Sequence, residues 1–270
     1  MSLPRTIPDR TEWHSLRPPL EPGELALAGL LDDNLPPGWV IAVQAQLWNS
    51  RPDVIAYNPE VGLGVFEVKD WDPDARQFRY SREKGALQAR SGPDESWYVT
   101  RDPVGQATGY QEAVRGLCYE DEPARRFVTT RVVLTNYPED HELLSDLRRT
   151  QTVWDRDHEK TFRVVGRETL DKSRINDLLP VAFDPGLQRP FWARTRQRIE
   201  SLLTEQEANV QQRDPLVLDK EKARLLQTHP KRRRIRGPAG SGKSVFIAAS
   251  AADAALSGRN ALVLVFNITQ

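Results

Sequence analysis

The stretch VGLGVFEVKDW, residues 61–71, is an apolar run that carries an acid and a lysine near its end. Residues two apart in a strand point to the same side, so Glu67 and Lys69 share one face while Phe66 and Val68 share the other. Burying a carboxylate and an ammonium is costly unless their geometry and partners are excellent. The pattern therefore predicts a strand whose charged end faces a cleft that holds a metal ion and a phosphate.

A second strand precedes this one. DVIAY, which starts at residue 53, is joined to GLGVFEVK by the turn-rich NPEVG, and this arrangement predicts a hairpin. If the hairpin is symmetric about Glu60, Asp53 lies opposite Glu67. Two carboxylates within reach of one cation suit Mg²⁺ or Mn²⁺, since Mg²⁺ binds proteins through one or two carboxylates and keeps waters elsewhere. Lys69 beside them would orient the attacking water or stabilise the charge of the transition state.

A helix is predicted from Pro22 onward, because leucines recur at helical spacing until the Asn-Leu-Pro-Pro-Gly stretch that ends it. Glu24 shares the buried stripe of Leu27 and Leu31, so we expect it to point inward near the hairpin as a third metal ligand. Glu21 lies at the helix start, where the helix dipole alone explains a carboxylate.

The segment DPVGQATGYQEAV begins at Asp102, a helix cap, and continues with Pro103 at the first helical position. It places Gln106 and Tyr110 one helical turn apart on one face. This pair could hold a phosphate or a base. The alternative is an ordinary half-exposed helix face.

The other predicted elements of the first 210 residues complete a mixed α/β pattern. They are a strand within 39–48, a helix at 104–117, a strand at 128–135, a strand at 162–166, a helix at 167–179 and a charged helix at 192–210.

Taken in order, these residues resemble the signature of the PD-(D/E)xK nucleases and, more narrowly, the nuclease-related (NERD) domain. The matching residues are Gly23-Glu24, Arg51-Pro52-Asp53, Glu67-Val68-Lys69 with Trp71, and Asp102-Pro103 through Gln106 to Tyr110. The similarity covers residues 20–180. It implies a restriction-endonuclease-like mixed sheet with flanking helices and Mg²⁺-dependent cleavage of phosphodiester bonds, usually in DNA. The alternative is an ordinary hairpin with a surface ion pair.

The resemblance also implies roles for individual residues. Asp53 and Glu67 would bind the metal ion, and Lys69 would lie beside the nucleophilic water. We expect Glu24, Gln106 and Tyr110 to complete the catalytic set.

A second motif, RIRGPAGSGKS, is a phosphate loop at residues 234–244. In such a loop backbone amides turn toward the phosphates, the lysine reaches the β- and γ-phosphates, and the final serine supplies a hydroxyl to Mg²⁺. A strand is predicted before the loop and a helix over 243–256 after it, whose N-terminus favours an anion. The residues expected to bind ATP are Gly237, Gly240, Ser241, Gly242, Lys243 and Ser244.

The phosphate loop and the ALVLVFN segment after it resemble superfamily I helicases. This implies that residues 215–270 form the first βαβ part of a RecA-like P-loop NTPase domain. Because no acidic Walker B strand, second lobe or arginine finger is present, we expect neither ATPase nor helicase activity from this chain alone.

Composition limits the partners. Thirty-eight basic residues balance thirty-eight acidic ones, so nucleic-acid binding must come from local patches. The single cysteine, Cys118, indicates a reducing compartment, and no signal-peptide core follows Met1. The apolar stretch at 261–266 is far shorter than the roughly 20 residues of a membrane span. We expect a cytoplasmic protein with no membrane partner.

These observations predict four regions: an N-terminal arm (1–19), a NERD-like nuclease domain (20–180), a linker with a connecting helix (181–214) and the start of a P-loop helicase domain (215–270). The predicted function is a metal-dependent nuclease that prefers DNA to RNA. In the full-length protein it would be coupled to an ATP-dependent motor, in DNA repair or phage defence, as a homo-oligomer or with partner proteins of those pathways. The alternatives are a non-cleaving nucleic-acid-binding module regulated by nucleotide at the P-loop, and an NTPase fragment whose N-terminal half mediates protein contacts.

Overall fold

The computed structural model describes residues 3–16, 18–45, 51–117, 127–150, 161–183 and 193–211, together with Ile247, Ser250, Ala251 and Ala254. The chain divides into two compact units, Met1–Val210 and Gln211–Gln270. Ile247, Ser250, Ala251 and Ala254 are helical and fall inside the helix predicted for 243–256. The phosphate-loop residues 237–244 and Cys118 lie outside the described residues.

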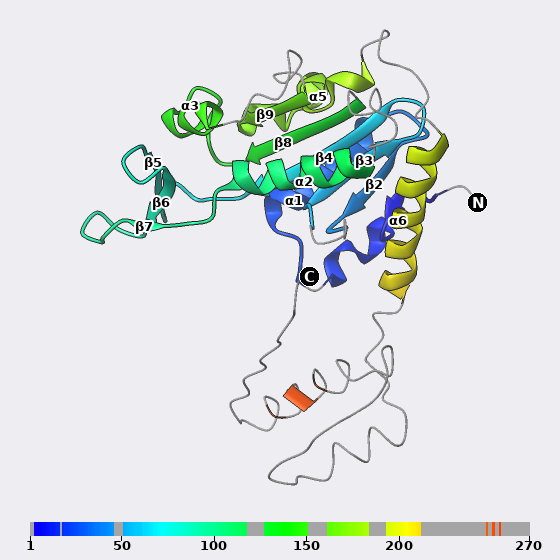
Figure 1. The fold of residues 1–270 in the computed structure, drawn as a ribbon, viewed down its shortest axis with the longest axis horizontal. Coiled ribbons are helices and arrows are strands. Elements are labelled where there is room, and N and C mark those ends of the chain that lie inside the picture. Colours follow the sequence, from blue (N-terminus) through cyan, green and yellow to red (C-terminus); the bar gives the residue numbers. More distant parts are fainter. Residues whose placement is uncertain are drawn as a thin grey trace. The chain divides into compact units, whose positions relative to one another are not determined.

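Six strands of the first unit form one mixed sheet in the order β1-β2-β3-β4-β8-β9 (Figure 1). β2, β3 and β4 are antiparallel neighbours, whereas β1 runs parallel to β2, and β8 and β9 run parallel to β4. The strands are β1 (Thr6–Ile7), β2 (Val40–Val43), β3 (Val54–Asn58), β4 (Gly62–Lys69), β8 (Val128–Leu134) and β9 (Phe162–Val165).

The β3–β4 hairpin has the register that the sequence predicts. Val54 pairs with Phe66 and Asn58 pairs with Gly62, so the hairpin is symmetric about Glu60. A slip of one residue would turn every side chain of β4 to the opposite face of the sheet. The register therefore decides where the charges at the end of β4 lie.

Helices cover both faces of the sheet, which makes the unit a mixed α/β fold. Tyr110 of α2 (Pro103–Leu117) and Ile199 of α6 (Ala193–Gln211) pack with one set of strand residues. Leu27 of α1 (Pro22–Asn34) and Leu178 of α5 (Ile175–Leu178) pack with the alternate set. Figure 1 shows α2 crossing the sheet and α6 along its β2 side.

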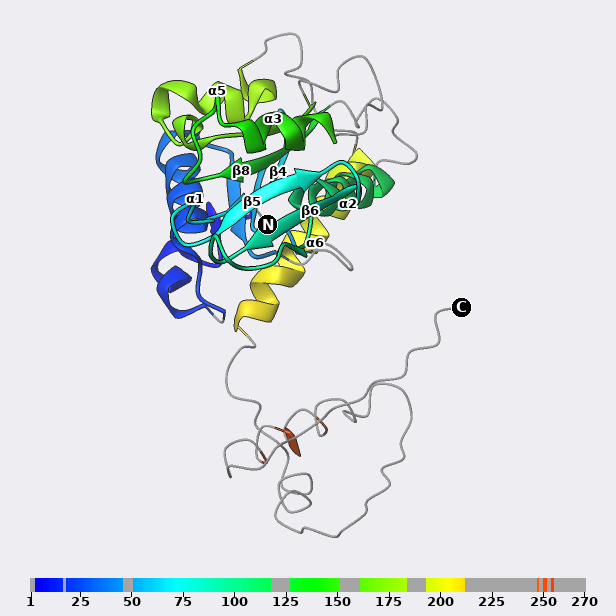
Figure 2. The ribbon, with the colours of Figure 1, turned by 90° about the vertical axis from the view of Figure 1, so that its left-hand side faces the viewer.

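A second, three-stranded antiparallel sheet was not predicted. It consists of β5 (Gln77–Ser81), β6 (Ala86–Arg90) and β7 (Tyr98–Val99), and it is inserted in the chain between β4 and α2. Leu87 of β6 is buried with Leu143 of α3 (Glu142–Arg149) and Val104 of α2. In Figure 2, β5 and β6 face the viewer.

The N-terminal arm predicted for residues 1–19 contains a strand and a helical turn. Thr6 and Ile7 form β1, and residues Arg10–Ser15 form the 3-10 helix η1. Trp13 is buried, and its indole N–H donates to the Pro8 carbonyl at 3.1 Å. The proline-rich composition gave no sign of β1, because this strand pairs with β2 through only two residues.

The single helix predicted for 167–179 was wrong. The segment forms short turns, η3 (Arg167–Thr169), η4 (Lys172–Arg174) and α5, followed by η5 (Pro180–Ala182). The Asp171 carboxylate accepts hydrogen bonds from the backbone N–H and the hydroxyl of Ser173, and such local bonds compete with a continuous helix.

The predicted boundaries at 180 and 214 differ from those of the two units. Ile199 and Leu203 of α6 are buried in the core of the first unit, so this helix is part of that unit and not of a linker. The strand predicted within 39–48 ends at Val43, because Gln44 adopts a left-handed backbone conformation with φ of 50°.

Replacing Gly62 by alanine is expected to destabilise the first unit by about 1–3 kcal/mol, the usual cost of overpacking. A Cβ atom there would lie 2.6 Å from the Phe127 carbonyl oxygen, a backbone atom that cannot rotate away. All seven tryptophans lie before residue 211, so urea unfolding followed by tryptophan fluorescence reports this unit.

Gly109→Ala is the matched control. Gly109 is exposed in α2 and has no atom within 4 Å of the added Cβ, so alanine there should stabilise the protein by about 0.5–1 kcal/mol. Equal effects of the two substitutions would contradict the packing described at Gly62.

Candidate functional site

The β3–β4 hairpin brings Asp53, Glu67 and Lys69 to the face of the sheet that α2 covers. Ile55 and Val65, which lie two residues from Asp53 and Glu67 respectively, pack in the same core as Tyr110 of α2. Since residues two apart share a face, the three charged side chains also lie on this side. The predicted common face for Glu67 and Lys69 is confirmed.

Asp53 lies immediately before β3 and is held by the backbone of β4. Its Oδ2 atom accepts a hydrogen bond from the Val68 N–H at 2.6 Å, and its own N–H donates to the Phe66 carbonyl at 3.1 Å. Burial raises the pKa of Asp53, while the Val68 N–H and the charge of Lys69 oppose the rise. The carboxylate is thus fixed to the strand that carries Glu67.

Glu67 is fully buried, and its Oε1 atom forms an ion pair with the Lys69 ammonium. Its other oxygen, Oε2, is also buried and has no hydrogen-bond partner among the described residues. Burial, followed by the charge of Asp53, raises the pKa of Glu67 to about 7. The alternative of a surface ion pair is therefore wrong, because one partner has no exposed surface at all.

Lys69 connects this buried acid to solvent. Its side chain is 22% exposed, whereas that of Glu67 is 0% exposed. An ammonium in this position neutralises part of the negative charge of the site and can meet a ligand that arrives from solution. Lys69 is the last residue of β4, so it lies at the end of a central strand of the sheet.

Glu24 points inward, as predicted from its spacing with Leu27. Its Oε2 atom accepts hydrogen bonds from the Glu21 N–H at 3.1 Å and from the Gln44 amide at 3.5 Å. Burial, followed by the charge of Asp53, raises the pKa of Glu24 to about 7. Glu24 is therefore the third acid of the site, and Asp53 interacts with both of the others.

Close packing explains why a glycine, Gly23, precedes Glu24. A Cβ atom at this position would lie 2.6 Å from Thr135 Cγ2 and 3.2 Å from Val68 Cγ1. Its N–H donates to Asp70 Oδ2 at 3.3 Å, and the other oxygen of Asp70 accepts from the Thr135 hydroxyl. The first turn of α1 thus rests directly on the ends of β4 and β8.

Gln106 and Tyr110 lie one turn apart on α2, as predicted, and both face the hairpin. The Gln106 amide donates to the Tyr110 hydroxyl at 2.5 Å, and that hydroxyl donates to the Arg51 carbonyl at 3.2 Å. Gln106 Oε1 is buried without a partner among the described residues. Burial raises the pKa of Tyr110, with the charges of Glu67 and Asp53 acting in the same direction.

Two residues of the site were missed as contributors. Gln44 receives hydrogen bonds from the Arg51 guanidinium at its carbonyl oxygen, 3.1 Å, and at Oε1, 2.7 Å, and it donates to Glu24. Nothing in the sequence marks Gln44, because its position depends on the left-handed backbone that ends β2. Arg51 precedes the predicted Asp53, but its interaction with Gln44 is not visible in the motif.

The donor set fits a hard divalent cation. The negative charge of Asp53 raises the pKa of Glu67, so a cation between the two carboxylates would relieve their repulsion. Glu67 Oε2 is buried and has no hydrogen-bond partner among the described residues. Within the described ranges no group of three or more His, Cys, Asp or Glu side chains is arranged as a metal centre. Asp53 and Glu67 would leave the remaining positions of a Mg²⁺ ion to water, which is how Mg²⁺ usually binds proteins.

No protein-family model, curated protein or solved structure matches this chain. In the described parts of the chain, no helix is long and apolar enough to cross a bilayer.

The stability of the metal-free protein should fall as the pH rises from about 4.5 to about 7. Glu24 and Glu67 have an ordinary pKa of 4.5 and a folded-state pKa of about 7, so the folded state binds more protons across this window. The free energy of unfolding decreases with pH wherever the folded state binds more protons than the unfolded state. Urea unfolding at several pH values in the presence of chelator measures the slope.

Asp53→Asn should reduce this slope without abolishing it, because it removes the charge of Asp53 but leaves burial, the larger cause of both pKa shifts. Asp74→Asn, at an exposed carboxylate before β5, is the matched control and should leave the slope unchanged. Added Mg²⁺ should raise the stability more at pH 8 than at pH 5. A stability that rises with pH in the chelated protein would contradict the buried acids described above.

Proposed function

We propose that the first unit is a metal-dependent nuclease of the PD-(D/E)xK type, similar to NERD domains, that hydrolyses phosphodiester bonds of DNA. The observation that carries the proposal is Glu67, a fully buried carboxylate with one oxygen paired to Lys69 and the other without a hydrogen-bond partner among the described residues. A hairpin built for stability alone gains nothing from this arrangement, because replacing a buried ion pair by hydrophobic residues is often neutral or stabilising.

The three charged residues suit phosphodiester hydrolysis. Asp53 and Glu67 would hold the metal ion, with Glu24 as the adjoining acid. When bound, Mg²⁺ acts as a Lewis acid on the phosphate and lowers the pKa of a bound water. Lys69 would orient the attacking water and stabilise the negative charge of the transition state with its ammonium group.

The residues around them support this chemistry by holding the carboxylates in place. The Val68 N–H fixes Asp53, and the Gln44 amide fixes Glu24. Tyr110 joins α2 to the Arg51 carbonyl, two residues before Asp53. Groups held in this way need little reorganisation when a substrate arrives, which is the basis of electrostatic catalysis.

The second unit would supply the coupling to ATP. Its phosphate-loop motif, with Lys243 and Ser244, and its resemblance to superfamily I helicases support an ATP-dependent motor in the full-length protein. A role in DNA repair or phage defence is part of the same proposal. These residues lie outside the described ranges, so the support comes from the sequence alone.

Glu67→Gln and Lys69→Met should each lower the rate of DNA cleavage in Mg²⁺ by at least about 100-fold, the usual cost of removing a charge that stabilises a transition state. Plasmid nicking and cutting of a labelled oligonucleotide measure the rate, in Mg²⁺ and in Mn²⁺, with chelator as the negative control. Circular dichroism verifies that each variant is folded.

The matched controls are Glu112→Gln, at an exposed position of α2, and Lys172→Met, at an exposed position of η4. Both should cut DNA at the parent rate. If the parent protein binds DNA but cuts neither substrate with either metal, the nuclease proposal fails. The non-cleaving binding module regulated by nucleotide then takes its place.

A further inference from the structure

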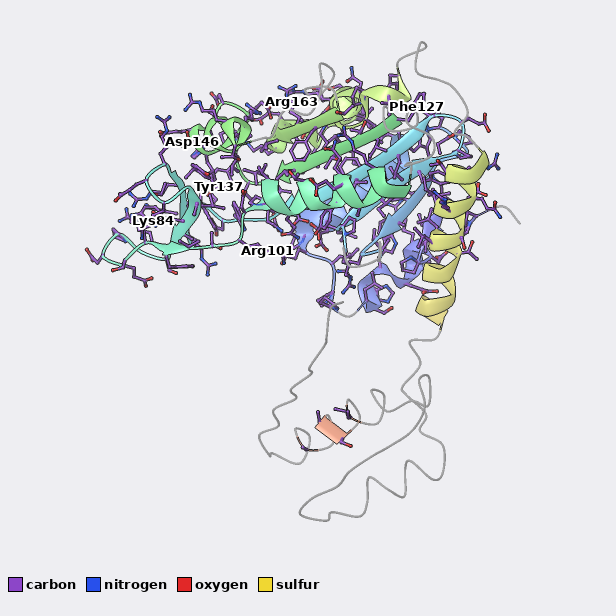
Figure 3. All side chains as sticks on the ribbon, viewed as in Figure 1. Lys84, Arg101, Phe127, Tyr137, Asp146 and Arg163 are labelled. Carbon is purple, nitrogen blue, oxygen red and sulfur yellow. The ribbon has the colours of Figure 1, made fainter. Side chains whose placement is uncertain are left out.

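The small sheet β5–β7 carries a concentration of positive charge in a chain that is neutral overall. Residues 76–101 contain six basic residues and three acidic ones, whereas the whole chain has 38 of each. Figure 3 labels two of the basic residues on this part of the molecule, Lys84 in the turn between β5 and β6 and Arg101 before α2. The six basic residues are Arg76, Arg79, Arg82, Lys84, Arg90 and Arg101.

None of these six forms an ion pair with a carboxylate in the described part of the chain. Exposed arginines elsewhere in the unit do so, for example Arg149 with Asp146 and Arg196 with Glu200. Among the described residues, no ion pair with a carboxylate therefore neutralises these six charges. Such a surface attracts a polyanion.

The two faces of the small sheet differ in their contacts. Leu87 of β6 and Phe78 of β5 lie on the face that packs toward α2 and α3. Residues opposite one another in register share a face, so Arg79 lies beside Gln88 and Arg90 lies beside Gln77 on the other face. This second face is the one that carries the two arginines.

Arg79 and Arg90 are held in place by neutral groups. The Cζ atoms of Arg79 and Arg90 lie 4.1 Å and 4.7 Å from the centre of the Trp97 ring. Arg79 also donates to Gln88 Oε1 at 3.2 and 3.1 Å, and Arg90 donates to Gln77 Oε1 at 2.8 Å. Neutral acceptors and an aromatic ring orient a guanidinium without cancelling its charge.

The small sheet is attached next to the candidate site. Trp71, two residues after Lys69, stacks on Phe78 of β5 with ring centres 4.0 Å apart and planes 9° apart. The path from Lys69 to Trp71, across the ring stack to Phe78 and on to Arg79 limits the distance between the Cα atoms of Lys69 and Arg79 to at most about 25 Å. A DNA strand crosses that distance in about seven steps of 3.4 Å.

We propose that the Arg79–Arg90–Trp97 face of the small sheet binds the phosphates of the DNA strand that enters the candidate site. The inference rests on the proposed function, because it assigns the surface that holds the substrate of the same site. Two fixed guanidiniums suit phosphate oxygens, which they bind in a planar, bidentate geometry. Val99 on the same face is 58% exposed and offers an apolar contact to a base or sugar.

The test measures binding without cleavage. A fluorescein-labelled 30-nucleotide single strand is titrated with the 270-residue chain in chelator at several salt concentrations, and log K is plotted against log salt. Each phosphate contact to single-stranded DNA contributes about 0.7 to the slope. Arg79→Gln/Arg90→Gln should therefore reduce the slope by about 1.4 and weaken binding at least tenfold at moderate salt.

Two further variants separate phosphate binding from a structural role. Arg149→Gln/Arg196→Gln removes the same charge from ion-paired positions and should leave the slope unchanged. Arg79→Lys/Arg90→Lys retains the charges but not the planar groups on Trp97, and should retain most of the slope. Equal losses in the glutamine and lysine variants, with a lowered melting temperature, would indicate a structural role and overturn the inference.

The remaining outcomes also decide the matter. Unchanged binding by Arg79→Gln/Arg90→Gln, or no binding by the parent chain, overturns the inference, and so does displacement of DNA by poly-glutamate at equal charge concentration. If the parent cuts DNA and the glutamine variant binds and cuts DNA equally well, the inference is overturned but the nuclease proposal remains intact. A parent that never cuts, but whose binding depends on Arg79 and Arg90, overturns the nuclease proposal and supports the binding surface.

Discussion

The antiparallel pairing of β3 with β4 is the constraint on which the candidate site depends. Its register fixes Glu67 on the α2 face and draws Asp53, at the start of β3, against the Val68 N–H. The same strand order then brings α1 to the ends of β4 and β8, where the absence of a side chain at Gly23 permits close contact. Glu24 follows directly in the chain and so reaches the hairpin.

The electrostatics of the site are unfavourable in the absence of a cation. Asp53 interacts with both Glu24 and Glu67, and burial together with the charge of Asp53 raises the pKa of both glutamates to about 7. Perturbed groups of this kind cluster at functional sites, although structural ion pairs also produce them. Here Glu67 Oε2, which is buried and has no hydrogen-bond partner among the described residues, favours a functional site, because a structural pair would satisfy both oxygens.

Local patterns predicted much of the sheet and of the site. The turn residues around Glu60 and the alternation of β4 specify the hairpin register, and helical spacing places Glu24 and the Gln106–Tyr110 pair. Those features depend on neighbours in sequence. The role of Gln44 was not predictable, because it depends on the left-handed residue that ends β2 and on a tertiary contact with Arg51.

The short strands and turns were the other weak point. β1 has only two residues, β7 has two, and neither has enough alternation to be recognised. The segment after β9 has the composition of a helix but contains Asp171, whose bonds to Ser173 divide it into turns. The small sheet was missed as a whole, although its positive charge can be read from the sequence, because β5 and β7 bury none of their residues and so lack an apolar alternation.

Anomalous diffraction from crystals of this chain soaked in manganese chloride is the most direct test of a cation bound between the two strands. A peak within coordination distance of Asp53 and Glu67, with Lys69 displaced from Glu67 Oε1 or retained beside the ion, is the expected result. Crystals that diffract well at saturating manganese and show no peak at these carboxylates would contradict it, and the buried acids would then need another explanation.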